Sequence, residues 1–328
     1  MMTHTHTDLP LAPPNFTHQT VLLQETVASL LNVKTLEQSQ KHAGVFVDAT
    51  FGRGGHGRLL LEHLADNATL IVFDKDPQAI AVAEDLVCQD KRVRVVHDSF
   101  ANLSDNLQKL GIEKVDGIMA DLGVSSPQLD DGSRGFSFMR EGTVDMRMDT
   151  SRGQSVGEWL ASVDEETLAN VLYEYGEERH SRRIARAIKQ MPNYTSTLEL
   201  AETIKQAHPK WQKGKHPATQ SFQAMRIFIN NELGDIEGFL EQSLTVLAPS
   251  GRLAVISFHS LEDRIIKQFL QKHSKGQYPE DENSPFPIQR PKYLSKPERI
   301  APSEAEVKFN PRARSAWLRS ASRTEVIG

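Results

Sequence analysis

The sequence predicts an α/β fold in which a Rossmann-like parallel sheet is interrupted by an all-helical insertion. Over the first 121 residues, short apolar runs of strand composition alternate with segments of helical periodicity. Such alternation is typical of parallel sheets, because each strand needs a crossover connection before the next. The alternation stops after residue 131, and another apolar strand appears only at residues 253–258. The stretch from 134 to 214 holds only helical patterns and polar loops, which indicates a helical insertion.

The first predicted strand, residues 44–47, ends in a glycine-rich loop. Residues 48–57 read DATFGRGGHG, and leucines at helical spacing follow from Leu59. Strand, glycine loop and helix in this order allow a nucleotide-like ligand to approach the backbone, because glycine has no Cβ. The loop is neither GxGxxG nor GxxxxGK[ST], which disfavours a dinucleotide and disfavours hydrolysis of ATP or GTP. A tight turn without a ligand is the simplest alternative.

Acidic residues end the first two predicted strands. Asp48 follows the first strand, and Asp74 follows the apolar run 70–73. A carboxylate roughly 20 residues beyond the glycine loop is where parallel α/β folds hold ribose hydroxyls. S-adenosylmethionine carries a sulfonium and an ammonium but no phosphate. Two acids beside a glycine loop therefore favour this cofactor over NAD.

Two further strands end in residues suited to the same ligand. Residues 92–96 precede Phe100, whose flat ring can stack on adenine, and residues 115–120 precede Asp121. Ligands of open α/β sheets bind at the carboxyl ends of the strands. We therefore expect these residues to share one site with Asp48 and Asp74.

The loop after the fourth strand offers acceptors for an amino group. It reads DLGVSSPQ from Asp121 to Gln128. The Ser126 hydroxyl and the backbone carbonyls around Pro127, which has no N–H, can accept hydrogen bonds from an exocyclic amine of a base. These acceptors would localise the nitrogen lone pair for an in-line methyl transfer. A plain exit from the strand is the alternative.

The predicted insertion carries a stripe of arginines on one helix. They follow the spacing i, i+3, i+4 and i+7, with apolar residues opposite. The four residues are Arg179, Arg182, Arg183 and Arg186. Contact with RNA phosphates is one interpretation and a solvated helix face is the other. A second basic stretch, 205–216, includes Trp211, and a third occupies the C-terminal tail.

Long segments of the chain resemble the MraW family of bacterial small-subunit ribosomal RNA methyltransferases, in order, from about His18 to the C-terminus. The matching segments are 50–56 (TFGRGGH), 74–80 (DKDPQAI), 121–131, 134–140 (RGFSFMR), 145–148 (DMRM), 216–219 (HPAT), 257–264 (SFHSLEDR) and 310–315 (NPRARS). The resemblance implies a class I methyltransferase that uses S-adenosylmethionine to methylate the N4 amine of a cytidine in the decoding region of 16S rRNA.

The resemblance also implies a set of cofactor-binding residues, each of which this sequence matches. They are Gly54, Gly55, His56, Asp74, Phe100, Asp121 and Gln128. We expect Asp121, Ser126 and Pro127 to be catalytic. Asp121 has two candidate roles, which are to hold the methionine part of the cofactor, as the family implies, or to accept the released proton.

Two features of the site remain open in the sequence. Amino-methyltransferases commonly place two prolines and an aromatic after the polar residue, whereas Gln128 and Leu129 stand here. Phe136, Phe138 or Trp211 would then stack on the target base. His259, just after the fifth strand, is expected to contact the substrate RNA; capping of the next helix by Ser260 is the alternative, and a hydrolytic triad is disfavoured.

Composition is that of a globular protein without membrane spans. Of 328 residues, 38% are hydrophobic and 25% charged, and no apolar run is long enough to cross a bilayer. The N-terminus lacks the features of a signal peptide, and one cysteine suits a reducing cytoplasm. Because the net charge is −5, any RNA surface must be local. No metal is expected, and a homodimer is compatible with the sequence.

The expected domains are a first methyltransferase part (1–133, with 1–15 disordered), a substrate-binding insertion (134–214) and a second methyltransferase part (215–328). The small ribosomal subunit is the expected partner. A DNA amino-methyltransferase and a cofactor-binding ribosome-assembly factor are the competing functions. The basic insertion disfavours the former, and the intact Ser126–Pro127 loop disfavours the latter.

Overall fold

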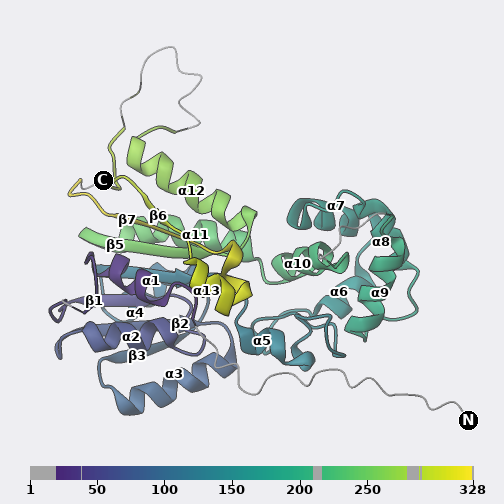
Figure 1. The fold of residues 1–328 in the computed structure, drawn as a ribbon, viewed down its shortest axis with the longest axis horizontal. Helices are drawn as coiled ribbons and strands as arrows, with labels where there is room; N and C mark the ends of the chain where they lie inside the picture. Colours follow the sequence, from purple (N-terminus) through teal and green to yellow (C-terminus); the bar gives the residue numbers. More distant parts are fainter. Residues whose placement is uncertain (1–19, 38, 210–215, 279–287, 289, 327–328) are drawn as a thin grey trace, which may run out of the picture.

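The computed structural model describes residues 20–37, 39–209, 216–278, 288 and 290–326 (Figure 1). The expected disorder of residues 1–15 lies outside these residues. So do Trp211 and most of the second basic stretch. In the described part, no helix has both the length and the apolar character that a membrane crossing requires.

A seven-stranded sheet in the order β3-β2-β1-β4-β5-β7-β6 forms the centre of the larger unit. The strands are β1 (Val45–Asp48), β2 (Thr69–Asp74), β3 (Val93–His97), β4 (Val115–Asp121), β5 (Leu247–Ser257), β6 (Glu298–Ile300) and β7 (Trp317–Ser322). Neighbours among β1 to β5 are parallel, whereas β7 is antiparallel to both β5 and β6. The Rossmann-like fold predicted from the sequence is therefore confirmed.

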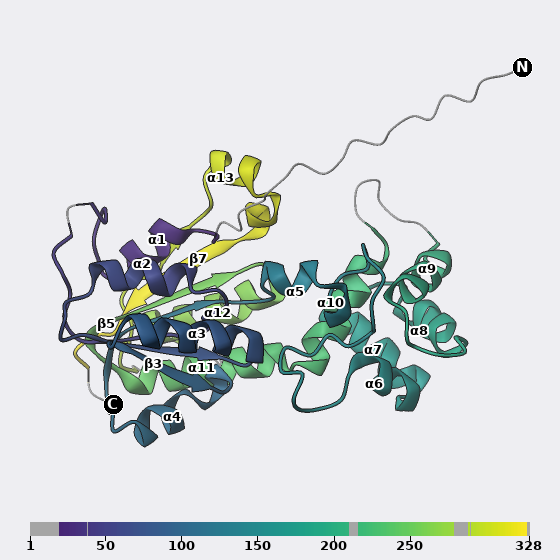
Figure 2. The same ribbon diagram turned by 90° about the horizontal axis from the view of Figure 1, so that it is seen from below.

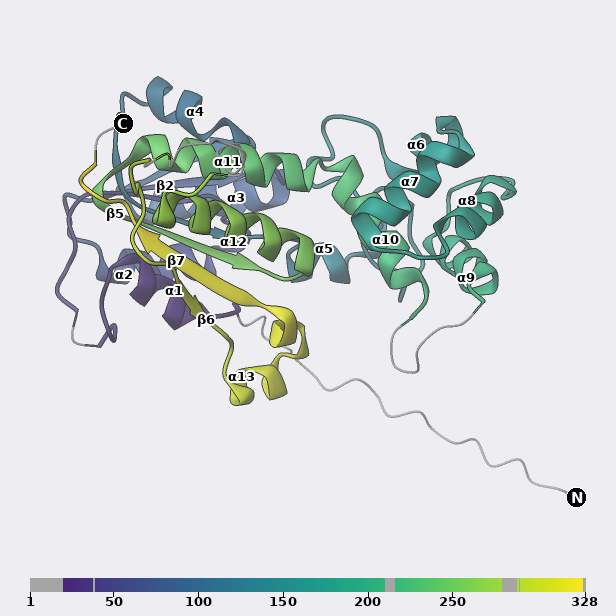
Figure 3. The same cartoon turned by 90° about the horizontal axis from the view of Figure 1, so that it is seen from above.

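Helices cover both faces of the sheet and bury two apolar layers. Against one face pack α1 (Leu23–Leu30), α2 (Gly55–His63) and α3 (Pro77–Gln89). Against the other pack α4 (Leu103–Lys109), α11 (Glu232–Val246) and α12 (Ser260–Lys275) (Figure 3). The central strands are apolar on both sides because both faces are covered. Their polar ends are consequently confined to the edges.

A separate helical unit lies beside the carboxyl edge of the parallel strands (Figure 2). Its helices are α6 (Val156–Ser162), α7 (Glu165–Gly176), α8 (Ser181–Lys189), α9 (Thr197–Ala207) and α10 (Ala218–Ile229). They enclose a core of their own that includes Leu168, Leu172 and Ile184. Phe222 and Met225 of α10 also belong to this core. By its packing, α10 joins the helical unit, beyond the boundary expected at residue 214.

The spacing of apolar residues in 218–247 predicts a helical segment with one apolar face, but the structure divides this segment in the middle into α10 and α11. Asn231 has φ 51°, a left-handed conformation that asparagine tolerates better than most residues. The neighbouring Asn230 bridges to the insertion, since its Nδ2 donates to the Met146 carbonyl and its Oδ1 accepts from the Met148 N–H, both at 2.7 Å. The break separates α10 in the helical unit from α11 on the sheet.

The C-terminal segment completes the sheet differently from the expectation. The apolar residues at 317–319 predict an edge strand, but β7 pairs with β5 on one side and with β6 on the other. Residues 277–302 are rich in proline, serine and charge, which predicts a loop, yet β6 lies within them and pairs with the outer edge of β7. Two short helical segments, α13 (Glu304–Phe309) and the 3₁₀ turn Pro311–Ser315, lead from β6 to β7.

Candidate active site

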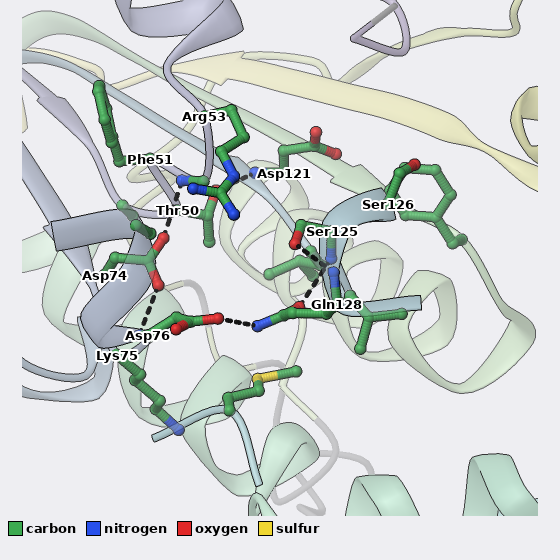
Figure 4. A pocket seen from close by; sticks show the side chains of 18 of the residues that line it. Thr50, Phe51, Arg53, Asp74, Lys75, Asp76, Asp121, Ser125, Ser126 and Gln128 are labelled. Carbon is green, nitrogen blue, oxygen red and sulfur yellow. Dashed lines mark hydrogen bonds between the residues drawn. The ribbon is translucent and has the colours of Figure 1, made fainter. Parts of the chain in front are cut away.

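A cavity of about 360 Å³ opens at the carboxyl edge of the parallel strands, facing the helical unit. Its walls come from the ends of β1, β2 and β4, from the loop that contains α5 (Ser126–Asp130), and from the 3₁₀ turn before β7. Of the nine residues expected to be catalytic or cofactor-binding, taken together, all except Gly54 line it. Figure 4 shows Asp74, Asp76, Asp121 and Gln128 arranged around this space.

The glycine loop has little room for side chains. Gly54 has φ +79°, and a Cβ there would lie 2.6 Å from the Phe51 ring. A Cβ on Gly55 would lie 1.9 Å from the Thr20 hydroxyl. Gly52 has φ +56° and nothing within 4 Å of where its Cβ would be, so this part of the loop faces open space. Glycine is therefore needed for backbone shape at Gly54 and for close packing at Gly55.

Asp74 connects the glycine loop to the end of β2. Its Oδ2 accepts the Gly52 N–H and its Oδ1 accepts the Asp76 N–H, both at 2.8 Å. Burial raises the pKa of Asp74, while these backbone donors oppose the rise. Each carboxylate oxygen retains acceptor capacity beyond the one bond, which is the property that ribose hydroxyls require.

Asp48 is buried at the end of β1, next to Ala49 and Thr50, which line the cavity, but does not line it itself. Burial raises its pKa to about 7, and Oδ2 has no hydrogen-bond partner among the described residues. Oδ1 accepts the Thr50 N–H at 3.2 Å. A buried carboxyl with a free oxygen favours a cationic neighbour, because a positive charge would offset the cost of ionising it.

Asp121 and His56 face each other across the end of β4. The Asp121 Oδ2 lies 3.8 Å from the His56 Nδ1. Burial lowers the pKa of His56 to about 4, so the imidazole is neutral near pH 7 and the contact is not an ion pair. Burial, together with the charges of Asp48 and Glu262, raises the pKa of Asp121 well above its usual value. Asp121 is thus suited to hold a proton.

The predicted catalytic loop begins helix α5. Ser125 is the N-cap, and its N–H donates to the Gln128 Oε1 at 2.9 Å in a capping box. Ser126 and Pro127 occupy the first turn, and the Ser126 hydroxyl makes no hydrogen bond within the described chain. The Gln128 amide is also engaged, since its Nε2 donates to the Asp76 Oδ2 at 2.8 Å. Gln128 therefore orients the loop from inside the cavity wall.

The aromatic rings near the site differ in whether they face the cavity or are packed inside the helical unit. Phe100 lines the cavity and packs edge-on against Phe239, with ring centroids 5.1 Å apart. Phe136 is buried, and Phe138 is stacked on His216 at 4.6 Å. Phe136 and Phe138 thus belong to the packing of the helical unit and do not present a free face for a base.

A polar cluster that the sequence did not identify as such lies at the end of β5. Arg226 donates from Nε and Nη2 to both oxygens of Glu232, at 2.7 and 2.8 Å. Glu262 is fully buried, and its Oε2 accepts the Phe258 N–H at 2.8 Å. Burial opposes the ionisation of Glu262, but His259 and Arg226 lower its pKa overall. The sequence carried one signal for this cluster. Glu262 stands three residues after His259, which is the spacing of a helix capping box.

His259 itself caps helix α12. Its Nδ1 accepts the Glu262 N–H at 3.4 Å, so His259, and not Ser260, is the N-cap. Glu232, His259 and Glu262 place ligand atoms within 4.8 Å of one another, a spacing compatible with a metal ion. However, Arg226 already supplies a positive charge to Glu232, which disfavours a second cation there.

The arginine stripe lies on the outer helices of the helical unit, away from the sheet (Figure 1). Arg182, Arg183 and Arg186 are exposed on α8, whereas Ile184 and Ile188 of the same helix are buried. Arg179 is exposed just before the helix. Arg186 pairs with Glu165 at 3.2 Å, while in the described part of the chain the other three arginines form no ion pair. The stripe and the cavity are therefore separate surfaces.

The fold and the cavity define a Rossmann-like methyltransferase of class I. Residues 15–324 match the model of the MraW methylase family. A protein of Psychrobacter sp. (strain PRwf-1), named ribosomal RNA small subunit methyltransferase H, is 73% identical over 327 residues, which cover 98% of this chain and 96% of that protein. A protein of the same name from Acinetobacter baumannii (strain AYE) is 58% identical, covering 95% and 99%. The chain belongs to the MraW methylase family.

The cavity fits S-adenosylmethionine, the methyl donor of this class. Asp121 lines the cavity and Asp48 is buried behind its wall, and Asp121 Oδ1 and Asp48 Oδ2 are acceptors without a partner among the described residues, which suits the positive charges of the cofactor. The open space beside Gly52, next to Asp74, suits its ribose. Phe100 is placed to contact its adenine.

Proposed function

We propose that this protein methylates the N4 amine of a cytidine in the decoding region of 16S rRNA. The observation that carries the proposal is one cavity shared by the cofactor-suited acids and the Ser125–Gln128 loop, in a chain 73% identical to a named small-subunit rRNA methyltransferase. S-adenosylmethionine, when bound, supplies an electrophilic methyl group on a sulfonium. The chain's own residues must align the amine with it and receive a proton.

The amine is a weak nucleophile because its lone pair is delocalised into the cytosine ring. Acceptors aimed at its hydrogens favour a localised lone pair on nitrogen. The free Ser126 hydroxyl and the backbone carbonyls around Pro127 are such acceptors on the cavity wall. Asp121, whose pKa burial raises, is suited to take the proton that the methylated nitrogen releases.

The RNA would be held by a surface distinct from the cavity. Exposed arginines on α8 would contact phosphates, which position RNA without reading its sequence. A looped or single-stranded target is favoured, since only an unstacked base can enter a cavity at the sheet edge. The small ribosomal subunit is accordingly the proposed partner.

The proposal is tested by transfer of a tritiated methyl group to purified small subunits from a strain that lacks the gene. The wild-type protein is expected to label 16S rRNA and not duplex DNA. Asp121→Asn and Ser126→Ala are expected to lower the rate while cofactor binding by Ser126→Ala persists. Label on DNA would favour a DNA methyltransferase. Normal subunit maturation supported by both inactive variants would favour an assembly factor.

A further inference from the structure

A buried ion pair joins the end of β2 to the start of the helical insertion. The Arg134 Nη1 donates to the Asp76 Oδ2 at 2.8 Å, and the two side chains are only 6% and 7% exposed. Neither residue belongs to the set expected from the sequence to bind the cofactor or the base, and of the two only Asp76 lines the cavity. Burying two charges is costly unless further hydrogen bonds satisfy them, so the partners of this pair indicate what it holds.

Asp76 is hydrogen-bonded both to the cofactor-binding side of the cavity and to the Ser125–Gln128 loop. Its N–H donates to Asp74, the acid suited to the ribose, at 2.8 Å. Its Oδ2 accepts both Arg134 and the Nε2 of Gln128, each at 2.8 Å. Gln128 in turn accepts the Ser125 N–H (Figure 4). One carboxylate therefore sets the position of the Ser125–Gln128 loop relative to Asp74.

The second terminal nitrogen of the Arg134 guanidinium is hydrogen-bonded to the loop that precedes α6 in the insertion. Its Nη2 donates to the carbonyls of Arg147 and Met148, at 3.1 and 2.9 Å. The Met148 N–H is bonded to Asn230, at the junction between α10 and α11. A planar guanidinium with fixed donor directions can make these bonds together, whereas a lysine ammonium is a point charge that cannot reproduce the fork.

We propose that Arg134 is a positioning residue that fixes the amine-binding loop, residues 122–131, between the cofactor-binding end of β2 and the RNA-binding insertion. The inference rests on the proposed function for its catalytic consequence. Arg134 does not line the cavity, so its effect is on alignment. A misplacement of about 1 Å can lower an enzyme's rate by about 100-fold, and this is the kind of error that Arg134 prevents.

The test compares Arg134→Met and Arg134→Lys with a matched control, Arg147→Met. Arg147 lies in the same segment but pairs with Asp145, at 2.8 Å, and does not contact the loop. We expect Arg134→Met to lower kcat on small subunits by about 100-fold, with KM and the cofactor Kd changed less than about threefold. Arg134→Lys should recover part of the loss, and Arg147→Met should match the wild type.

Hydrogen exchange on the free protein provides a readout that does not depend on catalysis. Amides of residues 122–131 should exchange about tenfold faster in Arg134→Met, while those of β4 and α7 keep their wild-type protection. Unchanged exchange in the loop together with unchanged kcat would overturn the proposal. If Arg134→Met also lost cofactor affinity and thermal stability along with loop protection, the proposal would be overturned as well, because Arg134 would then be merely structural.

A second variant addresses misfolding caused by an unpaired Asp76. The double change Asp76→Asn with Arg134→Met leaves no buried charge at this pair, and its one amide oxygen can accept either from Gln128 Nε2 or from the Gln78 N–H that Asp76 Oδ1 accepts at 2.9 Å. The double variant should fold but keep a low kcat, because the hydrogen bonds from residue 134 to the carbonyls of Arg147 and Met148 are still missing. Full activity would mean that Arg134 only neutralises Asp76. If the wild type itself transfers no methyl group to small subunits, the proposed function fails, and the exchange data still decide the role of Arg134.

Discussion

At the scale of single residues, the site is a group of acids whose pKa values the fold raises. Asp48, Asp74 and Asp121 end three adjacent parallel strands, and burial raises the pKa of each. A cluster of three ionised acids would repel itself in the free protein. Raised pKa values relieve this repulsion and leave acceptors that a cationic ligand can recruit.

The pKa of Asp48, about 7, predicts that cofactor binding releases a proton. A cationic ligand favours the ionised carboxylate, so affinity should rise as the pH rises from 5.5 towards 7.5 and level off above the free-protein pKa. Calorimetry across this range should show the slope, and Asp48→Asn should reduce it. A wild-type affinity that does not vary with pH would contradict this account.

Asp74 should be indispensable for cofactor affinity. Asp74→Ala removes the acceptor of the Gly52 and Asp76 N–H groups as well as the expected ribose contact. We expect at least a 100-fold weaker Kd in calorimetry, in line with loss of hydrogen bonds to a charged group. Asp116→Ala is the control, since Asp116 accepts a backbone bond from Val45 and lies outside the cavity wall. An unaltered Kd in Asp74→Ala would refute the ribose role.

The sequence located most residues of the cavity but not their bonding. Asp74, Phe100 and Asp121 could be placed because strand ends of a parallel sheet meet at one edge. The use of Ser125 as the cap, and of the Gln128 amide between Ser125 and Asp76, depends on side-chain directions that strand spacing does not encode. For Glu262, the local bonds to Phe258 and His259 follow from its place in the first turn of α12, whereas the nearby charge of Arg226 comes from a separate part of the chain.

At the scale of elements, helix α8 combines a packing face and a charged face. Ile184 and Ile188 are buried in the helical core while the arginines point outward. The amphipathic pattern predicted both faces correctly because a surface helix is organised by its own period of 3.6 residues. What the arginines bind stays a prediction.

Reversal of charge on α8 should separate RNA binding from cofactor binding. Arg182→Glu with Arg183→Glu should weaken binding to small subunits at least tenfold and flatten its salt dependence, because phosphate contacts release counterions. Calorimetry should give an unchanged cofactor Kd. Lys91→Glu with Lys109→Glu, exposed residues beside the sheet, makes the same change in net charge and should have little effect. Parallel losses of both affinities would argue against separate surfaces.

Other elements differ from what the sequence pattern predicts, because contacts with distant segments determine their structure. Residues 218–247 have a continuous apolar face, yet they divide at Asn230 and Asn231 because the two halves pack on different units. β7 is interior to the sheet because β6, 17 residues before it, covers its outer edge, a pairing that no local spacing reveals.

At the scale of the molecule, the sheet unit and the helical unit meet at one cavity. The sheet supplies the acids and the glycine loop, and the helical unit supplies an exposed basic helix. Asn230 and Arg134 connect the two units beside the cavity. Under the proposed function, a target base would enter at the sheet edge while phosphates of the neighbouring RNA would contact the helices.

The most direct test of this account is nucleoside mass spectrometry of 16S rRNA after unmethylated small subunits are incubated with the protein and S-adenosylmethionine. The account predicts N4-methylcytidine at one position in the decoding region, and none with Asp121→Asn. Methyl groups on another base, on a carbon or ribose atom of cytidine, or on no rRNA nucleoside at all would contradict it.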